Sequence, residues 1–192
     1  MANTFAPFGF LHVGFLEGAA PTFGNATKRI AAGNATAIYQ GDPVTQLNTG
    51  YIAQSTAGST QIHGIFVGCK YLSTSQGRTV WRSYWPGSDA TGDVEAYVIN
   101  SPQAIFRVQA NTNLTLADVG NNGQFAVGTG NTTTGISGSY INGASATTAT
   151  YPFRIVDLVR DPPGANGTDV TSANNWVVVT FNNQDYKSTT GI

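Results

Sequence analysis

From residue 35 onward the sequence is a succession of short stretches in which apolar and polar residues alternate, each closed by turn-forming residues. An apolar residue at every second position gives a strand one dry face, whereas an amphipathic helix needs a repeat near 3.6 residues. The pattern therefore predicts an all-β fold. We expect an antiparallel β-sandwich or barrel, jelly-roll-like, with at most one short helix.

Two candidate strands are apolar on both faces, residues 153–159 and 176–181. Strands of that kind have neighbours on both sides, so each is expected to be central in a sheet or covered by a neighbouring subunit. The full set of candidate strands is 35–40, 44–47, 51–54, 61–72, 79–85, 94–100, 104–110, 124–128, 135–141, 152–160 and 176–182.

Turn-forming and helix-capping residues support the division of the chain into these short strands. The Asn-Gly pairs at 122–123 and 142–143 predict hairpin turns, because both central residues of a type I′ turn need positive φ. One short helix is predicted at 115–119. Thr115 can cap its first turn, and Asp118 stands three residues later, as a capping box requires.

Residues 1–30 differ from the rest, because their apolar residues are interspersed with glycine and proline and show no sustained helical or strand period. We interpret them as an extended arm on a single β domain of residues 31–192. The arm is too apolar for a solvated tail, so another surface is expected to cover it. Its apolar residues are Phe5, Phe8, Phe10, Leu11, Val13, Phe15, Leu16 and Phe23.

Charge and cysteine content narrow the choice of partners. Only 10% of the 192 residues are charged and the net charge is −1, so the chain lacks the basic stripe that binds nucleic acid. No apolar run approaches the roughly 18–20 residues of a membrane span. We therefore expect no nucleic acid and no membrane as partner, and a chain made in the cytoplasm without a cleaved signal. The single cysteine, Cys69, is expected to be a small buried residue.

The sequence carries no recognisable catalytic motif: the nucleophile elbow, the phosphate loop and the dinucleotide fingerprint are all missing. His12 and His63 are far apart in the sequence, and packing or surface roles are favoured for both. Asp89, Asp93 and Glu95 could ligate Ca²⁺, but their spacing matches no EF-hand loop, so a solvated turn is favoured. We expect no enzymatic activity, no cofactor and no metal. A hydrolase site built from scattered carboxylates is the least favoured alternative.

An aromatic group, Trp81, Tyr84 and Trp85, has two interpretations. Alternation along one strand would place Trp81 and Trp85 on one face, where an exposed pair could stack on sugar rings. The favoured interpretation is a buried core or a subunit interface, which also uses such residues, and Trp176 is a candidate of the same kind.

Eight phrases spread over nearly the whole chain are Ala6-Pro-Phe-Gly-Phe, Ala37-Ile-Tyr-Gln-Gly-Asp-Pro-Val, Gly64-Ile-Phe-Val-Gly-Cys-Lys-Tyr, Tyr84-Trp-Pro-Gly, Gly92-Asp-Val-Glu-Ala-Tyr-Val-Ile, Ala117-Asp-Val-Gly, Pro152-Phe-Arg-Ile-Val-Asp-Leu-Val and Val179-Thr-Phe-Asn-Asn-Gln. Together these phrases resemble the head decoration, or capsid cement, proteins of tailed bacteriophages.

The resemblance implies a virion structural protein: a homo-oligomer, specifically a trimer, on the outer surface of the capsid, with the major capsid protein as its partner. The arm would then be the capsid-binding element and order on contact. Its contact residues would be Phe5, Pro7, Phe8, Phe10, Leu11 and Phe15. The alternative is a carbohydrate-binding or host-adhesion β-sandwich module of a virion or cell surface.

Overall fold

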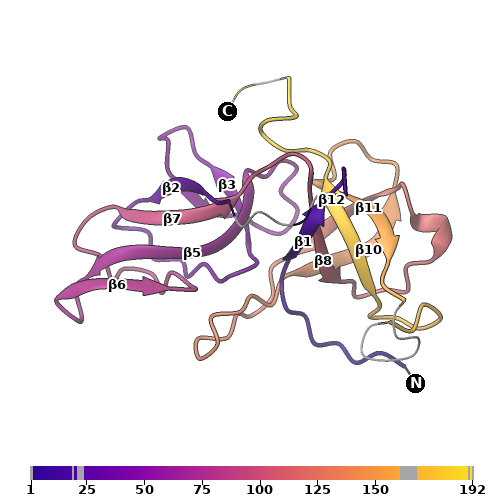
Figure 1. Ribbon diagram of the computed structural model, residues 1–192, viewed down its shortest axis with the longest axis horizontal. Coiled ribbons are helices and arrows are strands. Elements are labelled where there is room, and N and C mark those ends of the chain that lie inside the picture. The colour runs from indigo at the N-terminus through magenta and orange to yellow at the C-terminus, as the bar shows by residue number, and fades with distance from the viewer. Residues whose placement is uncertain (1, 19, 21–23, 161–167, 190, 192) are drawn as a thin grey trace.

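Two antiparallel sheets account for the named strands of the computed structural model, which describes residues 2–18, 20, 24–160, 168–189 and 191 (Figure 1). Sheet A has the order β1 (Leu11–Phe15), β8 (Ala104–Gln109), β12 (Trp176–Phe181), β11 (Phe153–Leu158), β9 (Asn122–Ala126) and β10 (Tyr140–Ala146). Sheet B has the order β2 (Ala26–Ile30), β7 (Val94–Ile99), β5 (Gly64–Ser73), β3 (Pro43–Gln46) and β4 (Ile52–Gln54), and β6 (Arg78–Arg82) pairs with β5. The predicted all-β sandwich is confirmed, and the sheets do not form a closed barrel.

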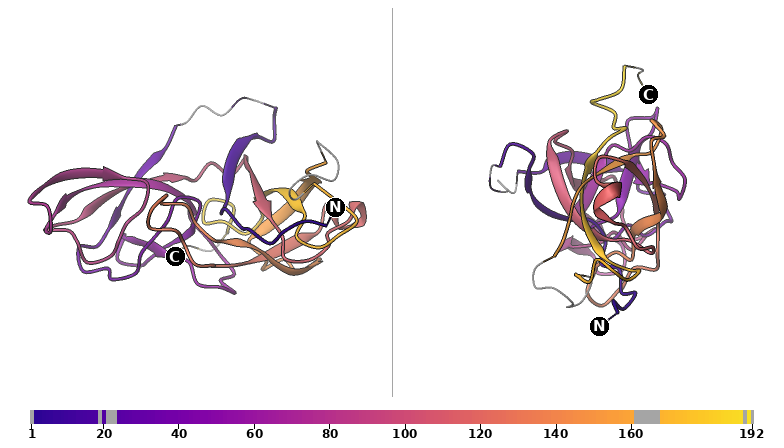
Figure 2. Two further views of the ribbon diagram at one scale, coloured as in Figure 1. Left: turned by 90° about the horizontal axis from the view of Figure 1, so that it is seen from below. Right: turned by 90° about the vertical axis from the view of Figure 1, so that its right-hand side faces the viewer.

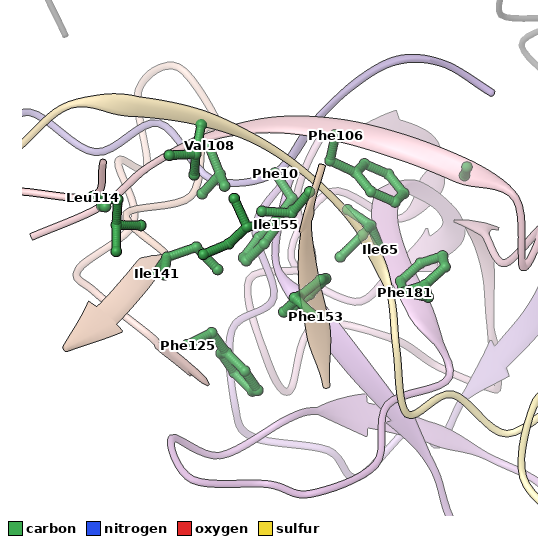
Figure 3. Close-up of a cluster of buried hydrophobic side chains, with 14 of the residues drawn as sticks. Phe10, Ile65, Phe106, Val108, Leu114, Phe125, Ile141, Phe153, Ile155 and Phe181 are labelled. Carbon is green, nitrogen blue, oxygen red and sulfur yellow. The ribbon is translucent and has the colours of Figure 1, made fainter. Parts of the chain in front are cut away.

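The two sheets are offset along the long axis of the molecule, one toward each end (Figures 1 and 2). Each has its own cluster of buried hydrophobic side chains. The cluster of sheet A, shown in Figure 3, also takes in Ile62 and Ile65 from the start of β5 and the turn before it. These two isoleucines therefore join the sheets through a shared core.

The two strands that are apolar on both faces are central in sheet A, which confirms the first of the two predicted explanations. β12 lies between β8 and β11, and β11 lies between β12 and β9. Phe153 and Phe181 are directly opposite each other across the β11–β12 pair, and both are buried. The side chains of β11 and β12 on the core face are buried, and Val156 and Val178 on the other face are half-buried.

The two Asn-Gly pairs do not form hairpin turns, so that prediction is wrong. The pair at 122–123 opens β9, and the pair at 142–143 lies inside β10, where the register with β9 shifts between Asn142 and Ala146. Gly143 has a φ of +77°. Its conformational freedom serves a bulge in a strand, which needs positive φ just as a turn does.

Two further boundaries differ from the prediction. The strand expected at 135–141 appears as Tyr140–Ala146, five residues later at each end. Residues 35–40 form only isolated bridges, from Ile38 to Trp85 and from Gln40 to Ile136.

The predicted helix is a single 3-10 turn, η1 (Leu116–Asp118), with the expected cap. The Asp118 carboxylate accepts hydrogen bonds from the Thr115 backbone N–H at 2.6 Å and from its hydroxyl at 2.8 Å. No helix in the described parts of the chain is long and apolar enough to cross a membrane.

The separate arm of residues 1–30 is not what the structure shows. β1 pairs with β8 at one edge of sheet A, and β2 pairs with β7 at one edge of sheet B. The division at residue 30 therefore cuts through both sheets. Phe23, assigned to the arm from sequence, lies outside the described residues.

A close crossing holds the start of β1 against the turn before β3. The Phe10 backbone N–H donates to the Gly41 carbonyl at 3.0 Å. Gly9 has a φ of +75°, and a Cβ there would lie 2.8 Å from the Cβ of Ser137. Only glycine fits at position 9, because both the backbone conformation and the space exclude a side chain.

Buried Asp42 binds the segments around this crossing. One carboxylate oxygen accepts hydrogen bonds from the Ser137 and Ser139 hydroxyls at 2.5 and 2.8 Å. The other accepts from the Tyr39 backbone N–H at 2.8 Å and from the Gln54 amide at 2.7 Å. Four donors satisfy the buried charge, so Asp42 joins three separate segments.

Candidate functional site

The first residues of the chain are bound to sheet A by specific hydrogen bonds. The buried Gln109 side chain on β8 accepts from the Ala6 backbone N–H and donates to the Thr4 carbonyl, both at 2.8 Å. The Asn3 amide donates to the carbonyls of Asp169 and Ala173 at 2.8 and 3.1 Å. Residues 3–6 are therefore anchored at one end of β8 and by the loop before β12.

This anchoring divides the six residues predicted as capsid contacts. Phe10 is buried and stacks on Phe153 with 4.3 Å between ring centroids. Pro7, Phe8 and Phe15 are half-buried. Phe5 and Leu11 remain exposed, at 46% and 44%. Phe10 is a core residue, and it cannot contact a partner while sheet A is intact.

The apolar surface that remains follows β1, the edge strand of sheet A. Leu11, Val13 and Leu16 are 37–44% exposed, and we call them the β1 apolar edge. A register shift between His12 and Gly14 marks a bulge in this strand. Bulges protect edge strands from pairing with further strands, so this edge is suited to side-chain contacts with a partner.

The two tryptophans expected on one face are separated, which corrects that prediction. Trp85 is fully buried, and its Nε1–H donates to the Asn34 carbonyl at 3.2 Å. Trp81 is 67% exposed and stacks in parallel on Tyr97 at 5.6 Å. β6 ends at Arg82 and the chain bends after it, so strand alternation no longer applies at residue 85.

The other two aromatic candidates have separate surroundings. Tyr84 stacks on Tyr39 at 5.4 Å. Trp176 is half-buried at the start of β12, where Phe8 meets its ring edge-on at 5.0 Å and the Arg107 guanidinium lies 5.2 Å from its centroid. The four aromatic candidates therefore do not form one site.

Trp176 and Arg107 contribute to a groove between the two sheets, with a volume of about 420 Å³. We call it the inter-sheet groove. Sheet A supplies residues from β1, β8 and β12, and sheet B supplies residues from β5 and β7. The described residues that line it are Phe8, Phe10, Leu11, His12, Asn25, Gln40, Gly41, Ile65, Phe66, Val67, Ile99, Arg107, Ile136 and Trp176.

The sequence analysis missed a buried pair, His63 and Asp185, which are 122 residues apart. His63 Nδ1 lies 2.8 Å from the Asp185 carboxylate. The Asn100 amide lies 3.3 Å from Nε2 and acts as its donor, which assigns the remaining ring proton to Nδ1. Both ring nitrogens are therefore engaged within the protein, and the fully buried ring has the packing role expected for it.

The three acidic residues weighed as calcium ligands have different partners. Asp89 accepts from the Ser75 backbone N–H at 2.9 Å, and this hydrogen bond is the main reason why the pKa of Asp89 is lowered. Asp93 contacts Arg29, and Glu95 contacts Lys70. Within the described residues no group of three or more histidine, cysteine and acidic side chains is placed to hold a metal ion.

Cys69 is buried as predicted, and this burial raises the pKa of its thiol to about 12. Its Sγ donates to the Tyr84 carbonyl at 3.5 Å. The thiol therefore stays protonated at neutral pH, and a thiol is a poor nucleophile in that form.

Comparison with protein-family models, curated proteins and solved structures finds no match for this chain.

Proposed function

We propose that this chain is a virion structural protein that decorates the outer surface of a tailed-phage head and stabilises the capsid lattice. The observation that supports this most is the β1 apolar edge, three large apolar side chains exposed on the bulged edge strand and directly after its end. Soluble proteins use such surfaces to contact other proteins. The phrases that resemble capsid cement proteins suggest the major capsid protein as the partner.

The expected strength of this contact favours a multivalent arrangement. Fully burying a Leu or Val side chain stabilises a complex by about 1.5–3 kcal/mol, and these three are already more than half buried. Together they contribute roughly 3 kcal/mol, before the cost of association is subtracted. A single chain would bind weakly, whereas several linked copies bind through their combined contacts.

A trimer on the symmetric shell supplies that multivalency. β11 and β12 are central strands of sheet A and offer no free strand edge, so the trimer contacts would involve other exposed residues. The low charged fraction, 10%, suits this arrangement, because closely packed copies would repel one another little. Size-exclusion chromatography with light scattering tests the oligomer: a mass of three chains supports the trimer, and a monomer at micromolar concentration contradicts it.

Variants of the β1 apolar edge test the proposed contact. The triple variant Leu11→Ser, Val13→Ser, Leu16→Ser should reduce co-sedimentation with heads that lack the protein by at least about tenfold, as expected for a loss above 1.4 kcal/mol. The control is Leu72→Ser with Leu116→Ser, because these two leucines are equally or more exposed but lie elsewhere. Equal binding by a folded triple variant and the wild type would contradict the proposal.

One observation favours a second candidate, carbohydrate binding. The exposed Trp81 ring lies on Tyr97, with the Lys70 ammonium 5.0 Å from the indole centroid. A single exposed indole can stack on one sugar ring. This candidate predicts a saccharide-dependent change in tryptophan fluorescence that disappears in Trp81→Ala, and no change across a glycan panel would exclude it.

A further inference from the structure

We infer that the inter-sheet groove is a binding site for a small amphipathic carboxylate, with the apolar body inside the groove and the carboxylate at Arg107. The groove shares Leu11 with the β1 apolar edge, but binding in it requires no capsid partner.

The size and lining of the groove suit a small apolar ligand. Its volume of about 420 Å³ lies within the usual range for small-molecule sites. Most of the lining is aliphatic or aromatic, including Ile65, Val67 and Ile99 from sheet B and Ile136 from the connection between β9 and β10. An alkyl chain bound here would be transferred out of water and would contact both sheets. Each methylene group buried in this way raises the binding constant by about fourfold.

Arg107 supplies the charge that selects the headgroup. Its guanidinium packs on the Trp176 ring, and its side chain has no hydrogen bond or ion pair with any described residue. Nε is buried without a partner. The other five arginines each have a polar partner: Arg29 contacts Asp93, Arg78 contacts Gln76, Arg82 contacts Tyr84, Arg154 contacts Asn122 and Arg160 contacts Asp157.

The rest of the groove offers nothing to neutralise this cation. Its lining contains no Asp or Glu among the described residues. His12, the other ionisable residue of the lining, has its pKa lowered by burial, and its Nε2–H donates to the Gly14 carbonyl at 3.0 Å. His12 is therefore neutral at physiological pH, and Arg107 is the one positive charge of the described lining. A guanidinium that lacks an acid binds a carboxylate through short, charge-assisted hydrogen bonds.

Three eight-carbon probes separate recognition of the carboxylate from simple filling of the groove: octanoate, 1-octanol and octylamine. We expect octanoate to bind at one saturable site by isothermal titration calorimetry. Octanol should bind at least about tenfold more weakly, because it lacks the charge-assisted hydrogen bond, and octylamine should bind more weakly still.

The variant Arg107→Gln should weaken octanoate binding at least about tenfold and leave octanol binding within about twofold. The matched control is Arg82→Gln, since Arg82 also packs on an aromatic ring, that of Tyr84 at 5.7 Å, but lies outside the groove. Arg82→Gln should bind octanoate like the wild type. Circular dichroism and thermal unfolding establish that each variant is folded.

The inference is overturned if octanoate shows no saturable binding at millimolar concentration, or if octanol binds to the wild type as tightly as octanoate does. It is also overturned if folded Arg107→Gln binds octanoate unchanged. Should Arg107→Gln fail to fold, the comparison of the three probes on the wild-type protein still decides the outcome. None of these results depends on whether the chain binds a capsid.

Discussion

Replacing Phe10 by Ala tests whether the N-terminal segment is part of the folded body. Phe10 is buried in the cluster of sheet A and stacks on Phe153, with 4.3 Å between centroids and an angle of 16° between the rings (Figure 3). Buried Phe→Ala changes cost about 3–5 kcal/mol, from lost transfer free energy and the cavity left behind. In a domain of this size, 1 kcal/mol lowers Tm by about 2–4 °C. We therefore expect a Tm lower by about 6–20 °C.

The assay is thermal unfolding followed by circular dichroism, with urea unfolding as a second measure of stability. Phe5→Ala is the matched control, because Phe5 lies in the same segment but is 46% exposed. Its Tm should change by about 3 °C or less. A Phe10→Ala protein with a Tm within about 2 °C of the wild type would show that Phe10 is not part of the core. It would favour the interpretation of the N-terminal residues as an arm separate from the folded body. For the same reason, deletion of residues 2–16 should destabilise the whole of sheet A, since it removes β1 and two of the partners of Gln109, Thr4 and Ala6.

Three further predictions concern individual side chains. Trp85→Ala should destabilise the protein by about 3–5 kcal/mol in urea unfolding, whereas exposed Trp81→Ala should cost about 1 kcal/mol or less; equal losses would contradict the separation of the two residues. Asp42→Ala should cost about 3 kcal/mol or more, because it leaves four donors without this acceptor, two of them the buried hydroxyls of Ser137 and Ser139. Asp42→Asn should cost less, and an Asp42→Ala variant as stable as the wild type would show that these hydrogen bonds contribute nothing. Cys69, whose pKa is about 12, should not react with a thiol reagent between pH 7 and about pH 9 in the native protein and should react once urea unfolds it; rapid native reaction would show an accessible thiolate.

The strands that could be predicted from sequence carry their own periodicity. Residues 104–110 have an apolar residue at every second position, and β8 is found at Ala104–Gln109. The 3-10 turn η1 was located by local chemistry, since Thr115 and Asp118 are three residues apart and bond directly. Such features depend on neighbours in the chain, so sequence reasoning reaches them.

β1 and β2 could not be predicted, because their stability comes from strands far along the chain. Leu11 lies opposite Arg107, and Ala26 lies opposite Val98. Gly14 and the bulge beside it remove the alternation that would have marked β1 as a strand. The long-range pairing partner, which sequence patterns do not reveal, decides the structure of these segments.

The inter-sheet groove was beyond sequence reasoning for the same reason. Nothing near Arg107 in the sequence indicates that its guanidinium packs on the Trp176 ring. The pair His63 and Asp185 is joined across 122 residues. The predicted facing of Trp81 and Trp85 failed because it extended a strand beyond Arg82, where β6 ends.

We propose that this chain is a structural component of a phage head. Quantitative mass spectrometry of purified particles, assembled from a genome that encodes the chain, tests it most directly by counting its copies relative to the major capsid protein. The proposed function predicts a fixed ratio, with a copy number comparable to that of the capsid protein. Particles that contain no copies, or only traces that vary between preparations, would contradict it.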